Sequence, residues 1–138
     1  MSASVLSLLA LLFFAFPPQQ STPPAATPVL KVIPLDAART VNPIKPTPES
    51  QAKAKSRYAM DCAMCHGAKG DGKGDPGIIS DMGLTMMDFT NPDTLKNRTD
   101  GELFYITKNG QGKMPIEDRA KADEIWNLVV YLRGFSKK

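Results

Sequence analysis

Both cysteines and the only histidine of this 138-residue chain lie in one pentapeptide, Cys62-Ala63-Met64-Cys65-His66. Two thiols three positions apart lie on one face of a helical turn, where both can reach the vinyl groups on one side of a porphyrin. The next residue supplies an imidazole that can turn under the ring toward the iron. The C-x-x-C-H spacing therefore predicts one haem held covalently by Cys62 and Cys65, with His66 as an axial iron ligand.

A bare C-x-x-C pair has three other interpretations. A zinc site needs about four ligands, and the chain has no second cysteine pair and no second histidine. A redox dithiol of the thioredoxin type would start a helix after a strand, whereas this pair follows a helical pattern and precedes a glycine-rich loop. A simple disulfide would leave the adjoining histidine unexplained. Haem attachment is the interpretation that uses all three side chains.

The second axial position of the iron has to be filled from elsewhere in the chain. Methionine is the natural candidate, because its thioether is a soft, neutral donor that favours ferrous iron. The internal methionines are Met60, Met64, Met82, Met86, Met87 and Met114. The two on the attachment helix lie on the wrong side to reach the distal face. We favour Met114, which sits in a glycine-containing loop beside Pro115, and Met86 and Met87 stay open as alternatives.

Helical patterns precede and follow the motif. Residues 50–64 are rich in Ala, Lys, Gln and Arg, which favours a helix. Ala54, Tyr58 and Cys62 recur every four residues, so one stripe of this helix leads into the first cysteine. A glycine-rich loop is expected over residues 67–77.

Two further helices are predicted toward the C-terminus. Thr99 and Glu102 have the spacing of a capping box, which starts a helix that ends before Gly110. A last helix is predicted over residues 120–133, with an apolar stripe of Ile125, Leu128, Val129 and Leu132. No alternating segment is long enough for a strand. We therefore predict an all-α class with short helices and long loops.

The N-terminal third has a different composition. Residues 5–16 form an apolar block that is too short to span a bilayer comfortably, since a spanning helix needs about 20 apolar residues. We interpret residues 1–26 as a secretory signal peptide, with an uncleaved membrane anchor as the alternative. Nine of the twelve prolines lie in residues 17–48, so residues 27–48 are predicted to be an extended, proline-rich linker. The folded domain is predicted over residues 49–138, in a periplasmic or exported protein.

Residues 50–134 resemble a small class I, mono-haem bacterial cytochrome c. The features that carry the resemblance are the attachment motif, the Lys113-Met114-Pro115 loop and the final helix with Trp126, Tyr131, Leu132 and Arg133. The resemblance implies a fold of short helices wrapped round one haem c, in which the first and last helices cross at nearly a right angle. Ala54 stands at that crossing, where many members carry glycine. The resemblance also implies that the Pro76 carbonyl accepts a hydrogen bond from His66.

These features predict a one-electron carrier rather than an enzyme, because His66 and Met114 would saturate the iron. The expected partners are redox proteins, and a monomer is expected. Four lysines lie in the two loops expected to rim the haem edge, Lys69, Lys73, Lys108 and Lys113. Two interpretations of them stay open, a weak basic docking face and scattered solubilising charges.

The charge balance of the chain gives no indication of nucleic-acid binding, because Lys and Arg exceed Asp and Glu by only +3. The alternative function is a haem-c domain with a labile distal methionine that acts as a ligand sensor or as a subunit of a redox enzyme.

Overall fold

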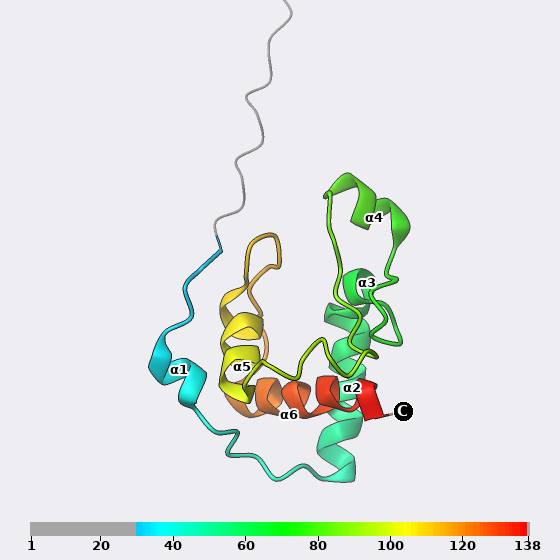
Figure 1. The fold of residues 1–138 in the computed structure, drawn as a ribbon. Coiled ribbons are helices and arrows are strands. Elements are labelled where there is room, and N and C mark those ends of the chain that lie inside the picture. The colour runs from blue at the N-terminus through cyan, green and yellow to red at the C-terminus, as the bar shows by residue number, and fades with distance from the viewer. Residues whose placement is uncertain (1–29, 138) are drawn as a thin grey trace, which may run out of the picture.

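The computed structural model describes residues 30–137, which form helices joined by long loops (Figure 1). The elements are α1 (Leu35–Arg39), α2 (Pro48–Asp61), α3 (Ala63–His66), α4 (Pro76–Asp81), α5 (Asp100–Asn109), α6 (Ala122–Arg133) and the 3₁₀ helix η1 (Phe135–Lys137). Within this described part the only β-type pairing is an isolated bridge between Gln111 and Met114. The predicted all-α class with long loops is therefore confirmed. The predicted signal peptide or anchor, residues 1–26, lies outside the described residues.

Helix α2 begins as its sequence dictates but ends earlier than predicted. Thr47 caps its N-terminus by accepting a hydrogen bond from the Ser50 amide (3.1 Å), and Pro48 occupies the first turn. The helix ends at Asp61 rather than at residue 64, because the backbone of Cys62 leaves the helical region with φ −120°. A short second helix, α3, then starts at residue 63 in a new direction. The attachment motif thus lies across a kink.

Helix α6 supplies the largest part of the core and packs against both α2 and α5 (Figure 1). Its predicted stripe is confirmed at Ile125, Leu128 and Val129, whose side chains are at most 2% exposed, while Leu132 is half-buried. Trp126 is buried as well and stacks on Phe104 of α5, with ring centroids 4.1 Å apart. A helix buried on more than one face needs partners on both sides, which α2 and α5 provide.

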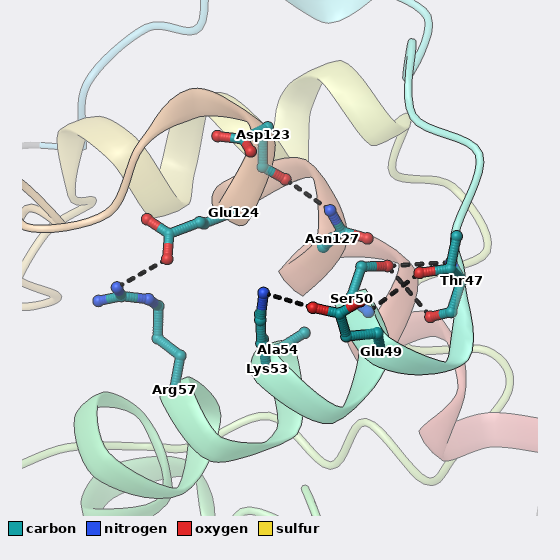
Figure 2. Close-up of a pocket in the computed structure, with 9 residues that line it drawn as sticks. All are labelled: Thr47, Glu49, Ser50, Lys53, Ala54, Arg57, Asp123, Glu124 and Asn127. Atoms are coloured by element: carbon teal, nitrogen blue, oxygen red, sulfur yellow. Dashed lines mark hydrogen bonds and ion pairs between the residues drawn. The ribbon is translucent and has the colours of Figure 1, made fainter.

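The α2–α6 junction buries apolar side chains, among them Ala54 and Leu128, and has a polar rim, which Figure 2 shows. Ala54 is buried where α2 approaches α6, so its small side chain permits the close packing implied by the resemblance. Figure 2 shows the rim, where Arg57 of α2 donates to Glu124 of α6 at 3.0 Å. Lys53 pairs with Glu49 along α2 at 2.7 Å, and both are exposed. A pocket with mostly polar lining residues lies at this rim, and none of the motif residues 62–66 lines it.

Helix α5 has the predicted capping box. The Thr99 hydroxyl accepts from the Glu102 amide (3.1 Å), and the Glu102 carboxylate accepts from the Thr99 amide (2.8 Å). Gly110 ends the helix with a left-handed φ of 68°, as predicted. Helix α4 was not predicted, because the glycine-rich composition of residues 67–77 masked a helix start at Pro76. Asp75 caps α4 by accepting from the Ile78 amide at 3.0 Å.

The proline-rich segment is folded against the domain where the structure describes it. Helix α1 corrects the expectation of extended chain for residues 35–39, which lie in a proline-free stretch after Pro34. It packs on α5, and the Thr99 hydroxyl donates to the Ala38 carbonyl at 2.6 Å. Further along, the Asn42 side chain donates to the Trp126 carbonyl at 3.2 Å.

Tyr58→Phe should lower the free energy of unfolding by about 0.5–1.5 kcal/mol, because it removes one of two hydrogen bonds to the Gly67 carbonyl, which keeps the Gly70 amide as a donor at 3.0 Å. The Tyr58 hydroxyl donates to the Gly67 carbonyl at 2.9 Å in a buried position. Urea unfolding followed by circular dichroism measures the change. Tyr131→Phe is the matched control, since the Tyr131 hydroxyl makes no hydrogen bond within residues 30–137. Equal losses for the two variants would contradict the assignment.

Candidate functional site

The motif cysteines lie at the kink between α2 and α3. The Cys62 carbonyl accepts hydrogen bonds from the amides of Cys65 (3.2 Å) and His66 (2.9 Å), which makes one tight turn of the three residues. Both thiols are free and half-buried, and no disulfide joins them. The structure therefore brings Cys62, Cys65 and His66 together as predicted from their spacing.

The loop after the motif folds back onto the motif backbone. The Gly72 amide donates to the His66 carbonyl (3.0 Å), and the Asp75 amide donates to the Met64 carbonyl (2.7 Å). Between them Gly74 passes so close that a Cβ atom would lie 2.2 Å from the Met64 oxygen and 2.5 Å from the Cys65 oxygen. Only glycine allows this approach, so the glycine-rich composition serves backbone contact with the motif.

His66 lies against an aromatic ring. Its imidazole stacks on Phe89 with centroids 5.0 Å apart and an interplanar angle of 24°. Phe89 is itself buried, and its amide donates to the Gly70 carbonyl at 2.7 Å, which ties residue 89 to the loop after the motif. Burial lowers the pKa of His66, which favours the neutral imidazole that can act as a ligand.

One nitrogen of His66 has no protein partner. Its Nδ1 atom is buried without a hydrogen bond, within the part of the chain that the structure describes. The predicted bond to the Pro76 carbonyl is not formed here, and Pro76 is an exposed residue at the start of α4. The role of Pro76 therefore stays a prediction. A buried polar atom without a partner is uncommon in a folded protein.

Met114 lies on a separate, narrow turn. Gln111 and Met114 exchange both main-chain hydrogen bonds, from the Gln111 amide (3.1 Å) and from the Met114 amide (2.9 Å). Gly110 enters the turn in a left-handed conformation, where a Cβ atom would lie 2.5 Å from the Met114 oxygen. The Lys113 ammonium donates to the carbonyls of Met82 and Gly83, the latter at 3.3 Å, so the turn contacts the segment after α4. This backbone is held in place by specific bonds.

Exposure separates the six internal methionines. Four are exposed, at 68%, 55%, 42% and 54% for Met60, Met64, Met82 and Met87. Met86 and Met114 are half-buried. Met114 alone of this pair has its amide and carbonyl hydrogen-bonded across a turn, and its role as an iron ligand stays a prediction.

An ion-pair cluster connects the motif to the chain after Met114. Arg57 approaches three carboxylates, those of Glu124 (3.0 Å), Asp61 (3.3 Å) and Glu117 (3.9 Å). The hydrogen bond that Arg57 donates to the Glu124 carboxylate is the main cause of the raised pKa of the Arg57 guanidinium. Sequence reasoning missed this cluster, although Arg57 and Asp61 have the i, i+4 spacing of an ion pair on a helix.

The electrostatics of Cys62 weigh against thiol redox chemistry. Burial, with the nearby Asp61 and Glu117 carboxylates, raises the pKa of the Cys62 thiol to about 11. A catalytic thiol of an oxidoreductase has a lowered pKa, because the thiolate is the nucleophile. Zinc is disfavoured too, since residues 30–137 hold no cluster of three or more His, Cys, Asp or Glu side chains that could bind a metal ion.

The residues present fit a covalently attached haem. Two unpaired thiols stand one turn apart, as two thioether bonds would require. Burial lowers the pKa of the neighbouring imidazole and so favours its neutral form, and a half-buried thioether lies on a turn held by main-chain hydrogen bonds. The four lysines of the predicted haem edge are all exposed, and among them Lys108 lies over the Phe104 ring at 5.9 Å.

Comparisons with known proteins place the attachment motif within a family domain. A family model described as cytochrome C oxidase, cbb3-type, subunit III, matches residues 49–132. A chain of the reducing HAO-like protein complex of Kuenenia stuttgartiensis is similar in structure, with a TM-score of 0.56 and 26% sequence identity over 67% of this chain. The alignment covers 46% of that longer chain. No curated protein matches. Within residues 30–137, none of the helices has the length and apolar character needed to cross a bilayer.

Gly74→Ala should reduce covalent haem attachment and lower the unfolding free energy by about 1–3 kcal/mol, because the added methyl would collide with the Met64 carbonyl. Gly77→Ala is the matched control, since the nearest atom to its Cβ is the Asp75 side chain at 3.2 Å. The measurement is the ratio of haem absorbance to total protein after expression with cytochrome c maturation machinery. Equal ratios for the two variants would refute the close-approach argument.

Proposed function

Since the chain belongs to the family of cytochrome c domains described as cytochrome C oxidase, cbb3-type, subunit III, we propose that it is a mono-haem, one-electron carrier. Its single haem-c attachment motif is formed by Cys62 and Cys65. When bound, the haem iron changes between its ferrous and ferric states and so holds or releases one electron. One observation carries the proposal. The domain contains both the attachment motif with its single histidine and a turn, held by main-chain hydrogen bonds, that presents Met114.

The protein residues have separate tasks in this proposal. The thiols of Cys62 and Cys65 hold the porphyrin through two thioether bonds, so it cannot dissociate. His66 supplies the proximal nitrogen, and burial keeps its imidazole neutral. Met114 supplies a distal thioether, which favours the ferrous state and raises the reduction potential. With both axial positions filled by side chains, no position stays open for a substrate, which favours a carrier over an enzyme.

Pro76 is part of the proposal as a partner of His66. Its carbonyl would accept a hydrogen bond from the Nδ1–H group of His66, whose nitrogen has no partner within residues 30–137. Such a bond would fix the ring orientation and strengthen the nitrogen donor. It requires a movement of the α4 start relative to His66.

The proposed partners are redox proteins that approach an exposed haem edge. Lys69 and Lys73 are exposed in the loop after the motif, and Lys108 is exposed at the end of α5. Lys113 is exposed too, but its ammonium binds the Met82 and Gly83 carbonyls. An acidic partner surface would complement these charges. We further propose an exported or periplasmic location, with residues 1–26 as a cleaved signal or as a tether.

A role as a subunit of a redox complex is the second candidate. The family description names an oxidase subunit, and the similar Kuenenia chain belongs to a protein complex. A carrier would purify as a monomer, whereas a subunit would co-purify with partner chains from its native membranes. A ligand-sensing role, the remaining alternative, requires that carbon monoxide displace the distal methionine readily at neutral pH.

Met114→Ala should abolish the weak far-red band of methionine-ligated ferric haem and allow carbon monoxide to bind the ferrous protein. The reason is that the variant has no thioether at the distal position. Met86→Ala and Met87→Ala are the matched controls and should keep the band. Absorption spectra of all three holoproteins test this. A band that survives in Met114→Ala and disappears in a control would transfer the ligand role to that control residue.

If the exposed lysines of the two loops form a docking surface, the reaction with an anionic oxidant should depend on salt concentration. Oxidation of the ferrous protein by hexacyanoferrate(III) should slow as ionic strength rises, and a Lys69→Gln, Lys73→Gln double variant should react several-fold more slowly at low salt. Lys45→Gln with Lys55→Gln is the control, since these exposed lysines lie outside the two loops. Stopped-flow rates that are independent of salt would leave the lysines with a solubilising role only.

A further inference from the structure

Gln111 stands between the methionine turn and a segment from the other end of the chain. Its main chain pairs with Met114, as described above. Its side-chain amide pairs with the main chain of Lys31, since Gln111 Oε1 accepts from the Lys31 amide (3.1 Å) and Gln111 Nε2 donates to the Lys31 carbonyl (3.0 Å). The oxygen and the nitrogen of the Gln111 side-chain amide thus both form hydrogen bonds with Lys31, 80 positions away. No signal in the sequence links these positions.

Residues 30–42, which we call the N-terminal strap, are anchored at several points. The Lys31 ammonium donates to the Asn109 carbonyl, beside Gln111. Helix α1 packs on α5, where Thr99 holds the Ala38 carbonyl at 2.6 Å. Asn42 donates to the Trp126 carbonyl at 3.2 Å. The strap therefore crosses from α6 over α5 to the methionine turn and is fixed to the domain along its length (Figure 1).

The turn is braced on its other flank as well. Lys113 binds the carbonyls of the Met82–Gly83 segment. After the turn, the Glu117 amide donates to the Thr107 carbonyl at 3.2 Å. These contacts fix the tip and the exit of the turn, while its entry at Gln111 is fixed by the strap. Removal of the strap contact would leave the first residue of the Gln111–Met114 pair without lateral support.

We propose that Gln111 is a positioning residue for Met114, and that the N-terminal strap acts through it to keep the thioether in place. This inference rests on the proposed ligand role of Met114. The amide of Gln111 is suited to the task, because it satisfies a main-chain donor and a main-chain acceptor at once. When the Met114 thioether leaves the iron, a turn with a fixed main chain keeps it nearby, so it rebinds quickly. A competing small ligand then reaches the iron less often.

The test measures how fast imidazole binds to the ferric holoprotein, a reaction that requires the distal methionine to leave. Gln111→Ala removes two hydrogen bonds and should raise this rate by about tenfold. Lys31→Pro removes the main-chain donor from the other side and should have a similar effect. Lys31→Pro also removes the ammonium that donates to the Asn109 carbonyl, but both changes break the contact between Gln111 and residue 31, so the double variant should be no faster than the faster single variant. The far-red band should persist in all three at reduced intensity.

Gln51→Ala is the matched control. It also removes two side-chain hydrogen bonds, to the Asn127 carbonyl (3.3 Å) and side chain (3.1 Å), at the α2–α6 junction. It should lower the thermal midpoint as Gln111→Ala does and leave the imidazole rate unchanged. If Gln111→Ala does not fold, Lys31→Pro carries the comparison.

The outcomes separate the inference from the function on which it rests. A far-red band that survives Met114→Ala would overturn the ligand role of Met114, and the positioning role with it. Loss of the band in Met114→Ala, with wild-type imidazole rates in Gln111→Ala and Lys31→Pro, would overturn the positioning role alone. A rate increase of equal size in Gln51→Ala would also overturn it, because general destabilisation would then suffice.

Discussion

The haem attachment motif depends first on the burial of Tyr58, whose side chain is 1% exposed. Its ring packs against those of Tyr131 and Phe135, with centroids 5.5 and 5.1 Å away, and its hydroxyl bonds to the Gly67 carbonyl. One side chain thus joins α2 to α6, to η1 and to the loop after the motif. Since a buried hydroxyl and a buried carbonyl both need partners, the chain can leave the motif in few directions. The kink at Cys62 lies between the two residues that this hydrogen bond joins, Tyr58 and Gly67.

Long-range hydrogen bonds hold the rest of the site, because regular structure covers little of it. Arg133 on α6 shows the pattern, since it donates to the Leu95 carbonyl (3.0 Å) and to Asp100 (2.6 Å) and so fixes a loop on both sides. Loops carry the functional residues of many proteins on a rigid helical frame. Here α6 with α2 and α5 forms the frame, and the loops around the attachment motif and Met114 are joined to it by individual hydrogen bonds.

Local signals made part of this fold predictable. The capping box at Thr99, the glycine after α5 and the apolar stripe of α6 are each encoded within a few residues, and each was confirmed. The end of α2 was placed too late, because contacts from the loop after the motif cause the kink. Helix α1 was missed, because proline density dominated its neighbourhood. The pairing of Lys31 with Gln111 spans 80 positions and has no local signature, so only the structure reveals it.

The N-terminal strap contains one proline, Pro34, which favours its docking. A proline limits the conformations of the unfolded chain, so less entropy is lost when the segment docks. Pro34 immediately precedes α1, where its fixed φ also suits the start of a helix. A strap with few buried side chains can therefore stay docked through a small number of hydrogen bonds. On the proposed function this matters for electron transfer, because a ligand whose backbone is held in both oxidation states adds little rearrangement to each exchange.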